Sequence, residues 1–431
     1  GGRKKKADLT RLGYRYATGD TLSLTTLASA KDAGISDSEL EDFVKRVHKG
    51  KTGPIDRKIF QANYNRFRDA ISDGMKNPNF NSPDWLLNQN LKYNAATFAA
   101  FKAHEEGSEI QKLLYDPETD DVRKWTDFRD RALQVSQKYN KRWLQTEYNH
   151  AAQASRQARK WQDFQSTKEL YPNLKYVSVK DNRTRHDHRE LDGAIYPIDD
   201  PFWDTYMPPN GWGCRCTGRP TDAGPKKAKG LPTNPKGFNN NPGKSGQVFP
   251  EDSAYFRKGI DKLVFNQVNK VVRPPEVVQK HYKEYQGYGE NYKKGNFNKE
   301  TGGYYKVHKS HNTNTSGWKY EEKVAIAQIK KGERIEFLDE NKYKKKTPDF
   351  RMSGETWDVK APESNSSNSV MEGIWDAKKA NNAIIVFRKK LDFEVLYEGY
   401  QRAKGRFKKE KKTMPKVHFF DKETGEIVRI K

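Results

Sequence analysis

A long segment of the chain, residues 125–161, contains neither glycine nor proline. Because these two residues weaken or end α-helices, their absence allows one helix to continue for many turns. Apolar side chains such as Phe128, Trp143 and Tyr148 are distributed along it in the pattern of a helix that packs on its neighbours. We therefore expect residues 1–165 to be mainly α-helical and structural, since nothing in them indicates catalysis.

Glycine and proline divide the rest of the chain into three further parts. Residues 166–222 combine Pro, Gly, Asp, Trp and His with short strand-like pieces, which predicts a small, irregular α+β module. Residues 223–303 are rich in Gly, Asn and Lys, which predicts a linker with a short helical segment. Residues 304–431 mix helical and strand patterns, so we expect an α+β domain there and a multidomain chain.

The layout of this last part can be predicted in more detail. Its helix is expected at residues 318–331, where apolar side chains recur at helical spacing. Short runs rich in β-branched and aromatic residues predict its strands. These runs are residues 335–338, 356–359, 383–387 and 393–396, followed by a hairpin of 416–420 with 426–430.

The chain carries a formal net charge of +24. Residues 263–431 supply about half of this surplus, because they hold 36 Lys and Arg against 23 Asp and Glu. Concentrated positive charge favours a polyanion, so nucleic acid is an expected partner. The alternative is a solvated lysine-rich surface. No apolar run is long enough to cross a bilayer, so no membrane partner is expected.

The two cysteines of the chain stand near two histidines. Cys214 and Cys216 are too close in sequence for an unstrained disulfide, and the chain offers them no other partner. Zinc binds thiolate sulfur and imidazole nitrogen in a tetrahedron, and His186 and His188 could complete the ligand set. A structural zinc site is therefore one interpretation of these residues. The alternative is that the cysteines are buried apolar groups and the histidines are surface hydrogen bonders.

A compound motif surrounds these residues. Its parts are Asp181-x-Arg183, His188, Leu191-Asp192-Gly193, Pro208-Pro209-Asn210-Gly211-Trp212 and Cys214-Arg215-Cys216. Over roughly residues 140–222 this order resembles the phage Mu protein F-like head morphogenesis family. The resemblance implies a minor capsid protein, present in few copies near the portal, that is needed for head assembly. Its expected partners are then portal and capsid proteins, and its expected location is the virion.

A second motif lies in the last part of the chain. A Pro-Asp pair ending at Asp349 is followed by Asp-x-Lys from Asp358 to Lys360, which is the PD-(D/E)xK pattern of many nucleases. The two aspartates on adjacent strands can hold Mg²⁺, and the lysine can neutralise charge on a scissile phosphate. Glu321 or Glu322, on the preceding helix, is a candidate further ligand. The alternative is a turn at Asp349 and a solvent-facing Lys360.

The neighbourhood of this motif carries a second resemblance. Its residues are Tyr320-Glu321-Glu322, Gly332, Pro348-Asp349-Phe350, Gly354, Trp357-Asp358-Val359-Lys360-Ala361-Pro362, Ser366 and Ala377. Over about residues 302–390 they are similar to the C-terminal tRNase toxin domain of CdiA-type contact-dependent inhibition proteins. The resemblance implies cleavage of RNA, and a toxin role implies an immunity protein as a further partner.

Two chemistries stay open for this domain. In a metal-free ribonuclease, His308 or His311 would act as acid or base while Lys360 stabilises the developing negative charge. In a metal-dependent nuclease, Asp349 and Asp358 would hold Mg²⁺ instead. The alternative for the two histidines is a polar loop at a strand edge.

Taken together, the two resemblances imply a phage minor capsid protein fused to a C-terminal nuclease-like domain of tRNase type. The nucleic acid that it binds would be RNA or phage DNA. Such a protein would be found in the phage head and in the cytoplasm of the bacterial host. One alternative is a stand-alone nuclease toxin delivered with a phage-like particle. Another is a non-catalytic head protein that binds nucleic acid, for which charge and aromatic side chains suffice.

Overall fold

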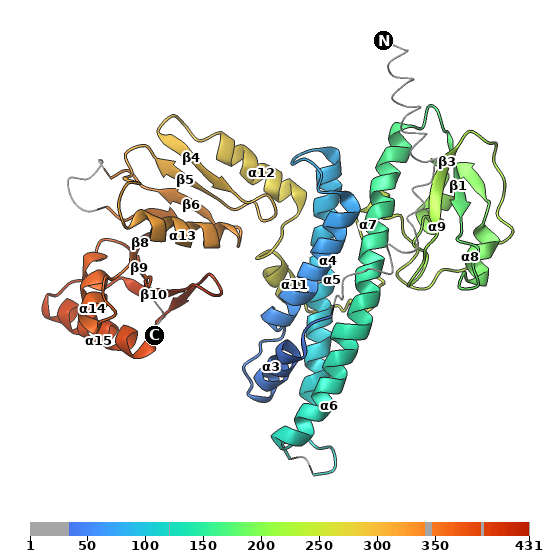
Figure 1. Ribbon diagram of the computed structural model, residues 1–431. Helices are drawn as coiled ribbons and strands as arrows, with labels where there is room; N and C mark the ends of the chain where they lie inside the picture. The colour runs from blue at the N-terminus through green and yellow to red at the C-terminus, as the bar shows by residue number, and fades with distance from the viewer. Residues whose placement is uncertain (1–33, 120, 341–346, 389–391, 431) are drawn as a thin grey trace. The chain divides into compact units, whose positions relative to one another are not determined.

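The computed structural model describes residues 34–119, 121–340, 347–388 and 392–430 (Figure 1). Residues 1–33, the start of the expected helical region, lie outside this described part. The chain forms two compact units, Gly1–Val268 and Asn269–Lys431. Among the described helices, none is long and apolar enough to cross a membrane.

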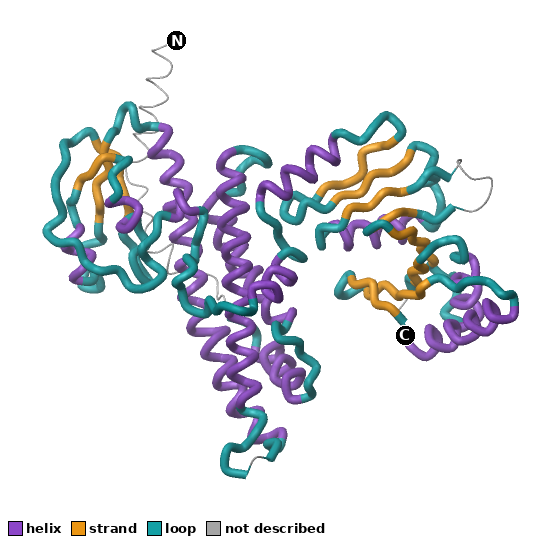
Figure 2. Tube along the Cα trace, turned by 180° about the vertical axis from the view of Figure 1, so that it is seen from behind, coloured by secondary structure: helices purple, strands orange, loops and turns teal. Residues whose placement is uncertain are grey.

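Long helices make up most of the first unit. They are α3 (Asp37–His48), α4 (Arg57–Met75), α5 (Pro83–Lys112), α6 (Trp125–Gln137), the π-helix η1 (Lys138–Trp143) and α7 (Leu144–Ser166). The segment without glycine and proline is helical, as predicted, because α6, η1 and α7 follow one another without a break. Helices α4, α5 and α7 lie side by side (Figures 1 and 2).

Sequence and packing explain how these helices begin and meet. Ser36 caps α3, because its hydroxyl accepts a hydrogen bond from the backbone N–H of Glu39 while the Glu39 carboxylate accepts one from Ser36. Gly74 allows α4 to approach α7 closely, since a Cβ atom there would lie 2.0 Å from Oγ of Ser155. Helices α4 and α7 are therefore closely packed at this point.

A small sheet packs on the end of α7. It is formed by β1 (Asn173–Val177), β2 (Ile195–Pro197) and β3 (Thr217–Thr221), in the antiparallel order β2-β1-β3, with the short helices α8 (His186–Leu191) and α9 (Phe202–Tyr206). Its core contains Tyr176 and Trp203 together with Trp161 and Phe164 of α7. The expected α+β module thus shares its core with the preceding helix, and the predicted boundary at residue 165 does not separate two cores.

The predicted linker, residues 223–303, is wrong as a structural description. Its first part packs on α5, where Phe249 stacks on Phe98 at a ring distance of 3.8 Å and Asn94 binds the Phe249 backbone at 2.8 Å. This part contains the helices α10 (Pro242–Ser245) and α11 (Asp261–Val268). The second part contributes α12 (Pro275–Gln286) and β4 (Tyr292–Phe297) to the second unit. Aromatic side chains and sheet pairing therefore outweigh the polar composition of the segment.

The second unit is built on one eight-stranded mixed sheet in the order β11-β10-β9-β8-β7-β6-β5-β4. Its further strands are β5 (Tyr304–His308), β6 (Arg334–Phe337), β7 (Phe350–Met352), β8 (Glu355–Lys360), β9 (Asn382–Ile385), β10 (Lys416–Asp421) and β11 (Glu426–Arg429). Its further helices are α13 (Trp318–Ile329), α14 (Ser367–Asp376) and α15 (Phe393–Lys409). The pairs β5/β6, β8/β9 and β9/β10 are parallel, and the others are antiparallel.

Helices cover both faces of this sheet. One core lies under α13 and includes Ile335, Phe350 and Val359, whereas another lies under α14 and α15 and includes Ile385. Because successive strand residues point to opposite faces, each strand contributes alternate side chains to each side. This alternation determines which polar side chains lie on the same face of the sheet and can therefore form a common site.

The strand predicted at residues 393–396 is wrong, because these residues begin α15. The Asp392 carboxylate accepts hydrogen bonds from the backbone N–H groups of Glu394 and Val395 and so caps the helix. Leu396, Ala403 and Phe407 are buried at helical spacing. The other predicted strands and the helix of this unit are confirmed to within a few residues.

Candidate functional sites

The structure brings the Pro-Asp and Asp-x-Lys motifs together in the second unit. Asp349 directly precedes β7, and Asp358 and Lys360 lie two residues apart on the neighbouring strand β8, so they share a face. Oδ2 of Asp349 accepts a hydrogen bond of 2.6 Å from the backbone N–H of Val359. The Lys360 ammonium donates a hydrogen bond to the Asp358 carboxylate. The hairpin of β7 and β8 thus assembles two carboxylates and one ammonium group.

Electrostatics in this cluster are dominated by burial and by the two neighbouring acids. Burial raises the pKa of Asp349 well above its usual range, and the charges of Asp358 and Glu321 add to this effect. Burial likewise raises the pKa of Asp358, against the opposing effect of Lys360. Burial acts to lower the pKa of Lys360, but the two aspartates raise it overall. Lys360 therefore remains a cation beside two acids whose charges repel each other.

Of the two glutamates expected near the cluster, Glu321 influences the pKa values of its acids and Glu322 does not. Glu321 is buried and raises the pKa of both aspartates. Glu322 instead accepts a hydrogen bond of 2.6 Å from the Tyr305 hydroxyl. The two side chains diverge because successive residues of a helix point about 100° apart. Glu322 is therefore replaced by Glu321 as the candidate acid of α13.

The two candidate histidines lie beside the cluster without joining it. His311 is buried, and its Nε2 lies 3.2 Å from Oε2 of Glu321 while its Nδ1 lies 3.2 Å from Oε1 of Glu340. His308 lies at the end of β5, with its Nδ1 2.7 Å from the Ser310 hydroxyl. Among the described residues, no hydrogen bond or ion pair joins either histidine to the aspartates or the lysine. The structure therefore places His311 between two glutamates and outside the cluster of aspartates and lysine.

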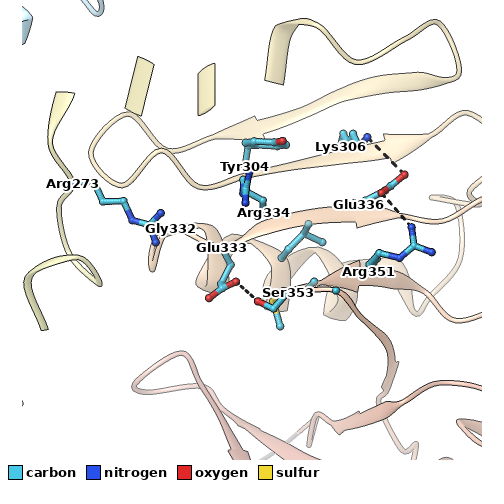
Figure 3. A pocket seen from close by; sticks show the side chains of 12 residues that line it. Arg273, Tyr304, Lys306, Gly332, Glu333, Arg334, Glu336, Arg351 and Ser353 are labelled. Atoms are coloured by element: carbon cyan, nitrogen blue, oxygen red, sulfur yellow. Dashed lines mark hydrogen bonds and ion pairs between the residues drawn. The ribbon is translucent and has the colours of Figure 1, made fainter. Parts of the chain in front are cut away.

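A polar hollow of about 360 Å³ lies on the sheet of the second unit (Figure 3). The side chains that surround it include Arg273, Lys306, Arg334 and Arg351, with Tyr304, Glu333 and Glu336 between them. No sequence motif indicated this set, because its members come from separate strands and from the segment before α12. Strand alternation, applied to correctly placed strands, is the signal that could have found them.

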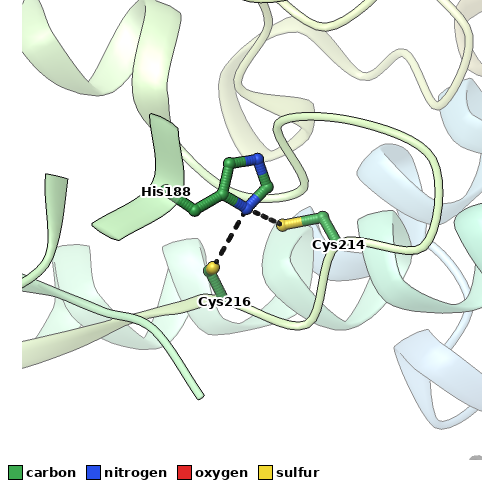
Figure 4. A group of neighbouring side chains, drawn as sticks. All are labelled: His188, Cys214 and Cys216. Carbon is green, nitrogen blue, oxygen red and sulfur yellow. Dashed lines mark hydrogen bonds between the residues drawn. The ribbon is translucent and has the colours of Figure 1, made fainter. Parts of the chain in front are cut away.

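The first unit holds the second candidate site, at His188, Cys214 and Cys216 (Figure 4). Nδ1 of His188 lies 3.4 Å from Sγ of Cys216 and 3.7 Å from Sγ of Cys214, and all three residues are buried. A tetrahedral zinc ion with bonds of about 2.0–2.3 Å would hold its ligand atoms roughly 3.5–4 Å apart. These three residues therefore fit a zinc ion by both chemistry and spacing.

His186 does not fit as the fourth ligand. Its side chain is 83% exposed and its Nε2 lies 3.8 Å from Oε1 of Glu190. Both histidines lie in α8, where residues two apart point to nearly opposite sides of the helix. Among the described residues, the cluster of His, Cys, Asp and Glu at metal-ligand spacing contains three members, so the prediction of His186 as a ligand is not supported.

Other residues of the compound motif hold the loops that carry these ligands. Arg215, between the two cysteines, makes two hydrogen bonds of 2.6 and 2.7 Å to the Asp181 carboxylate, which hold the pKa of Asp181 well below its usual range. The buried Asn210 accepts a hydrogen bond of 3.0 Å from the Tyr176 hydroxyl. The motif therefore encodes a rigid support around His188 and the cysteines.

The cysteine pair contains one group that ionises readily. The hydrogen bond from Cys216 lowers the pKa of Cys214 well below its usual range, with a further contribution from His188 and opposition from burial. The same hydrogen bond and burial raise the pKa of Cys216. Thiolate is the form of cysteine that binds metals, so the pair already favours one ligand in its reactive form.

Comparison with known proteins confirms both resemblances. Residues 106–219 match the family model described as phage Mu protein F like protein. Residues 345–425 match the model of the contact-dependent growth inhibition CdiA C-terminal domain. The chain therefore contains a region similar to phage Mu protein F and, after it, a region similar to the CdiA C-terminal domain. The metal-ligand cluster lies within the first match, and Asp349, Asp358 and Lys360 lie within the second.

Two relatives carry phage names. The chain is 41% identical over 90 residues to a protein of Escherichia phage Mu assigned as capsid assembly protein F, over 21% of this chain and 20% of the relative. It is 58% identical over 45 residues to the Mu-like prophage FluMu F protein of Haemophilus influenzae, over 10% of this chain and 11% of the relative. The matches thus span a fifth or less of these relatives. No solved structure matches the chain significantly.

Proposed function

We propose that this chain is a phage head morphogenesis protein whose C-terminal region cleaves RNA. The Mu F-like match at residues 106–219 and the relative assigned to capsid assembly support the first part. The proposal of RNA cleavage rests on one observation. A single hairpin brings together Asp349, Asp358 and Lys360. The two activities use different residues, so a single chain can hold both.

If the first part is right, purified phage particles will contain this protein at low copy number. The partners expected for a minor head protein are the portal and the capsid. Mass spectrometry of particles and of assembly intermediates is the measurement, with the major capsid protein as the reference for copy number. Absence of the protein from both samples would remove the structural role and leave a separately acting nuclease.

The donor set of the C-terminal cluster fits a hard divalent cation. Mg²⁺ prefers carboxylate oxygens and is commonly held by one or two carboxylates together with water and substrate phosphates. Asp349 and Asp358 supply such carboxylates, and their mutual repulsion would be relieved by a bound cation. We assign these two residues as the ligands of Mg²⁺, with Glu321 behind them.

The chemistry of the site follows from these groups. A bound Mg²⁺ would supply Lewis acidity at the phosphoryl oxygens and lower the pKa of a bound water. Lys360, a cation held beside Asp358, is placed to stabilise negative charge that develops on the phosphate. The metal-free alternative needs a histidine as acid or base, but among the described residues neither His308 nor His311 has a hydrogen bond or ion pair to Asp349, Asp358 or Lys360.

The full-length protein is expected to cleave RNA, with tRNA as the first substrate to test, more readily than duplex DNA. Cleavage should stop in EDTA and return with Mg²⁺. Products that form in EDTA and end in a 2′,3′-cyclic phosphate would instead show attack by the 2′-hydroxyl, for which DNA has no counterpart. A protein that binds nucleic acid but cuts none under either condition would be the non-catalytic binder considered above.

A further inference from the structure

The polar hollow of the second unit lies on the same sheet face as the candidate catalytic cluster. Across the strands, Lys306 pairs with Glu336, Glu336 with Arg351 and Arg351 with Thr356. Their neighbours in sequence, such as Tyr305 and Ile335, are buried in the core under α13. The side chains of this cross-strand row therefore point to the opposite face, where Figure 3 shows Lys306, Glu336 and Arg351 lining the hollow.

The same alternation connects the hollow to the cluster. Arg351 follows Asp349 by two residues, and Thr356 precedes Asp358 by two residues. Two residues of a strand span about 6.7 Å, and residues two apart share a face. Arg351, which lines the hollow, is therefore only two strand positions from Asp349, so one bound strand can reach both the hollow and the carboxylates.

Positive charge exceeds negative charge in this hollow. Arg273, Lys306, Arg334 and Arg351 line it, against the two carboxylates of Glu333 and Glu336. Glu336 is shared by two cations, at 3.7 Å from Nζ of Lys306 and 3.7 Å from a guanidinium nitrogen of Arg351. Arg334 is paired with Glu284 outside the hollow, at 2.8 Å. Because both contacts to Glu336 are longer than a hydrogen bond, each cation can turn toward a phosphate.

Aromatic rings accompany these cations. Tyr304 lines the hollow, and the Lys306 ammonium lies 3.9 Å from the centre of the Tyr292 ring. Cations that follow a backbone, with aromatic faces on which bases stack, are the features of surfaces that bind single-stranded nucleic acid. Bases paired in a duplex are not available for such stacking. The composition of the hollow therefore favours an unpaired strand.

We infer that this hollow binds the single-stranded RNA segment that flanks the scissile phosphate, with Lys306 and Arg351 on backbone phosphates and Tyr304 against a base. This inference rests on the proposed nuclease function, and it adds that the protein binds the single-stranded segment of the substrate beside the scissile phosphate. It also predicts that cleavage occurs in loops or single strands, where the flanking bases are free to stack.

The test uses the full-length protein with Lys360→Ala in every variant, so that the RNA probe stays intact. The probe is a labelled single-stranded oligoribonucleotide, and the comparison ligand is duplex DNA of equal length. Lys306→Gln with Arg351→Gln removes two cations of the hollow. Lys404→Gln with Lys408→Gln is the matched control, because it removes two exposed cations of α15 that do not line the hollow. Thermal melting verifies that each variant is folded.

The hollow variant is expected to bind the oligoribonucleotide at least about tenfold more weakly than the parent. The slope of log affinity against log salt should fall by about 0.7 for each backbone phosphate that the variant no longer neutralises. The control should retain the parent affinity. Equal losses in both variants, or no loss in the hollow variant, would overturn the inference, and so would parent binding that is as strong for duplex DNA as for RNA.

These outcomes test the binding role of the hollow and the proposed nuclease activity independently of each other. If the protein with Lys360 intact never cuts RNA but the hollow variant loses affinity, the hollow remains a binding surface and the nuclease proposal fails. If the intact protein cuts RNA and the hollow variant binds RNA normally, the nuclease proposal is retained and the assignment of the hollow as an RNA-binding surface is wrong.

Discussion

Replacing Lys360 with alanine should lower the rate of RNA cleavage by about a hundred- to a thousandfold, the usual cost of removing one group that stabilises transition-state charge. The side chain donates to Asp358 and its positive charge is maintained by two aspartates, so alanine removes the cation and leaves the acids unbalanced. Binding of RNA should change only a few-fold, because the surface that holds the strand is unaltered. Single-turnover cleavage and equilibrium binding, measured on the same preparations, are the two readouts.

Asp349→Asn refines this experiment. The asparagine side-chain oxygen can still accept the hydrogen bond from the Val359 backbone, so the hairpin keeps its support while the carboxylate charge is lost. Loss of activity in this variant would therefore report on charge and not on folding. Lys404→Ala, an exposed lysine of α15, is the control and should cleave at the parent rate. If Lys360→Ala cleaves within a few-fold of the parent, the assigned chemistry is wrong.

The second large effect concerns the site of the first unit. The purified protein should contain about one zinc ion per chain, and either Cys214→Ser or Cys216→Ser should remove it, because the thiolate is a far better zinc ligand than a hydroxyl. Since metal bound by the native state alone adds to folding stability, the melting temperature of the first unit should fall by about 5 °C or more. Elemental analysis and calorimetry measure the two effects.

His186→Ala is the matched control for this prediction. The side chain of His186 is exposed on α8, whereas His188 faces the cysteines, so the His186 variant should keep its zinc and the His188→Ala variant should lose it. The full-length protein is needed, because Trp161 and Phe164 of α7 belong to the core beneath the site. A folded parent protein that contains no zinc, and melts equally in EDTA, would leave the cysteines as buried apolar groups.

Local patterns predicted those parts of the fold that local interactions determine. The absence of glycine and proline from residues 125–161 is enough to predict a helical run, but it contains no signal for the π-helix at Lys138–Trp143. At residues 393–396, β-branched and aromatic side chains favoured a strand, and the Asp392 cap and the packing of Leu396 produced a helix. The linker prediction was wrong for a related reason. The segment around Phe249 is held by stacking on Phe98 of α5, which is distant in sequence.

For the candidate sites, too, the sequence predicted only what local patterns determine. The sequence identified Asp349, Asp358 and Lys360, because adjacent strands of a hairpin bring such motifs together, and their catalytic role stays a prediction. It could not choose between Glu321 and Glu322, and it included His186 with His188 among the zinc ligands, because the direction of each side chain depends on how its helix is turned. The polar hollow was not predicted, since its residues come from three strands and a preceding segment whose pairing only the assembled sheet reveals.

The strand order of the second unit has a consequence for how the protein folds. From β4 to β11 the strands lie across the sheet in the order in which they occur in the chain. Each strand therefore pairs with one that was synthesised just before it, and every crossover encloses only a short intervening segment. Low sequence separation between paired residues favours fast folding, even where a sheet contains parallel pairs. As the chain leaves the ribosome, the sheet can grow one strand at a time, with Glu321, Asp349, Asp358 and Lys360 drawn together from a single short stretch before its last strands are made.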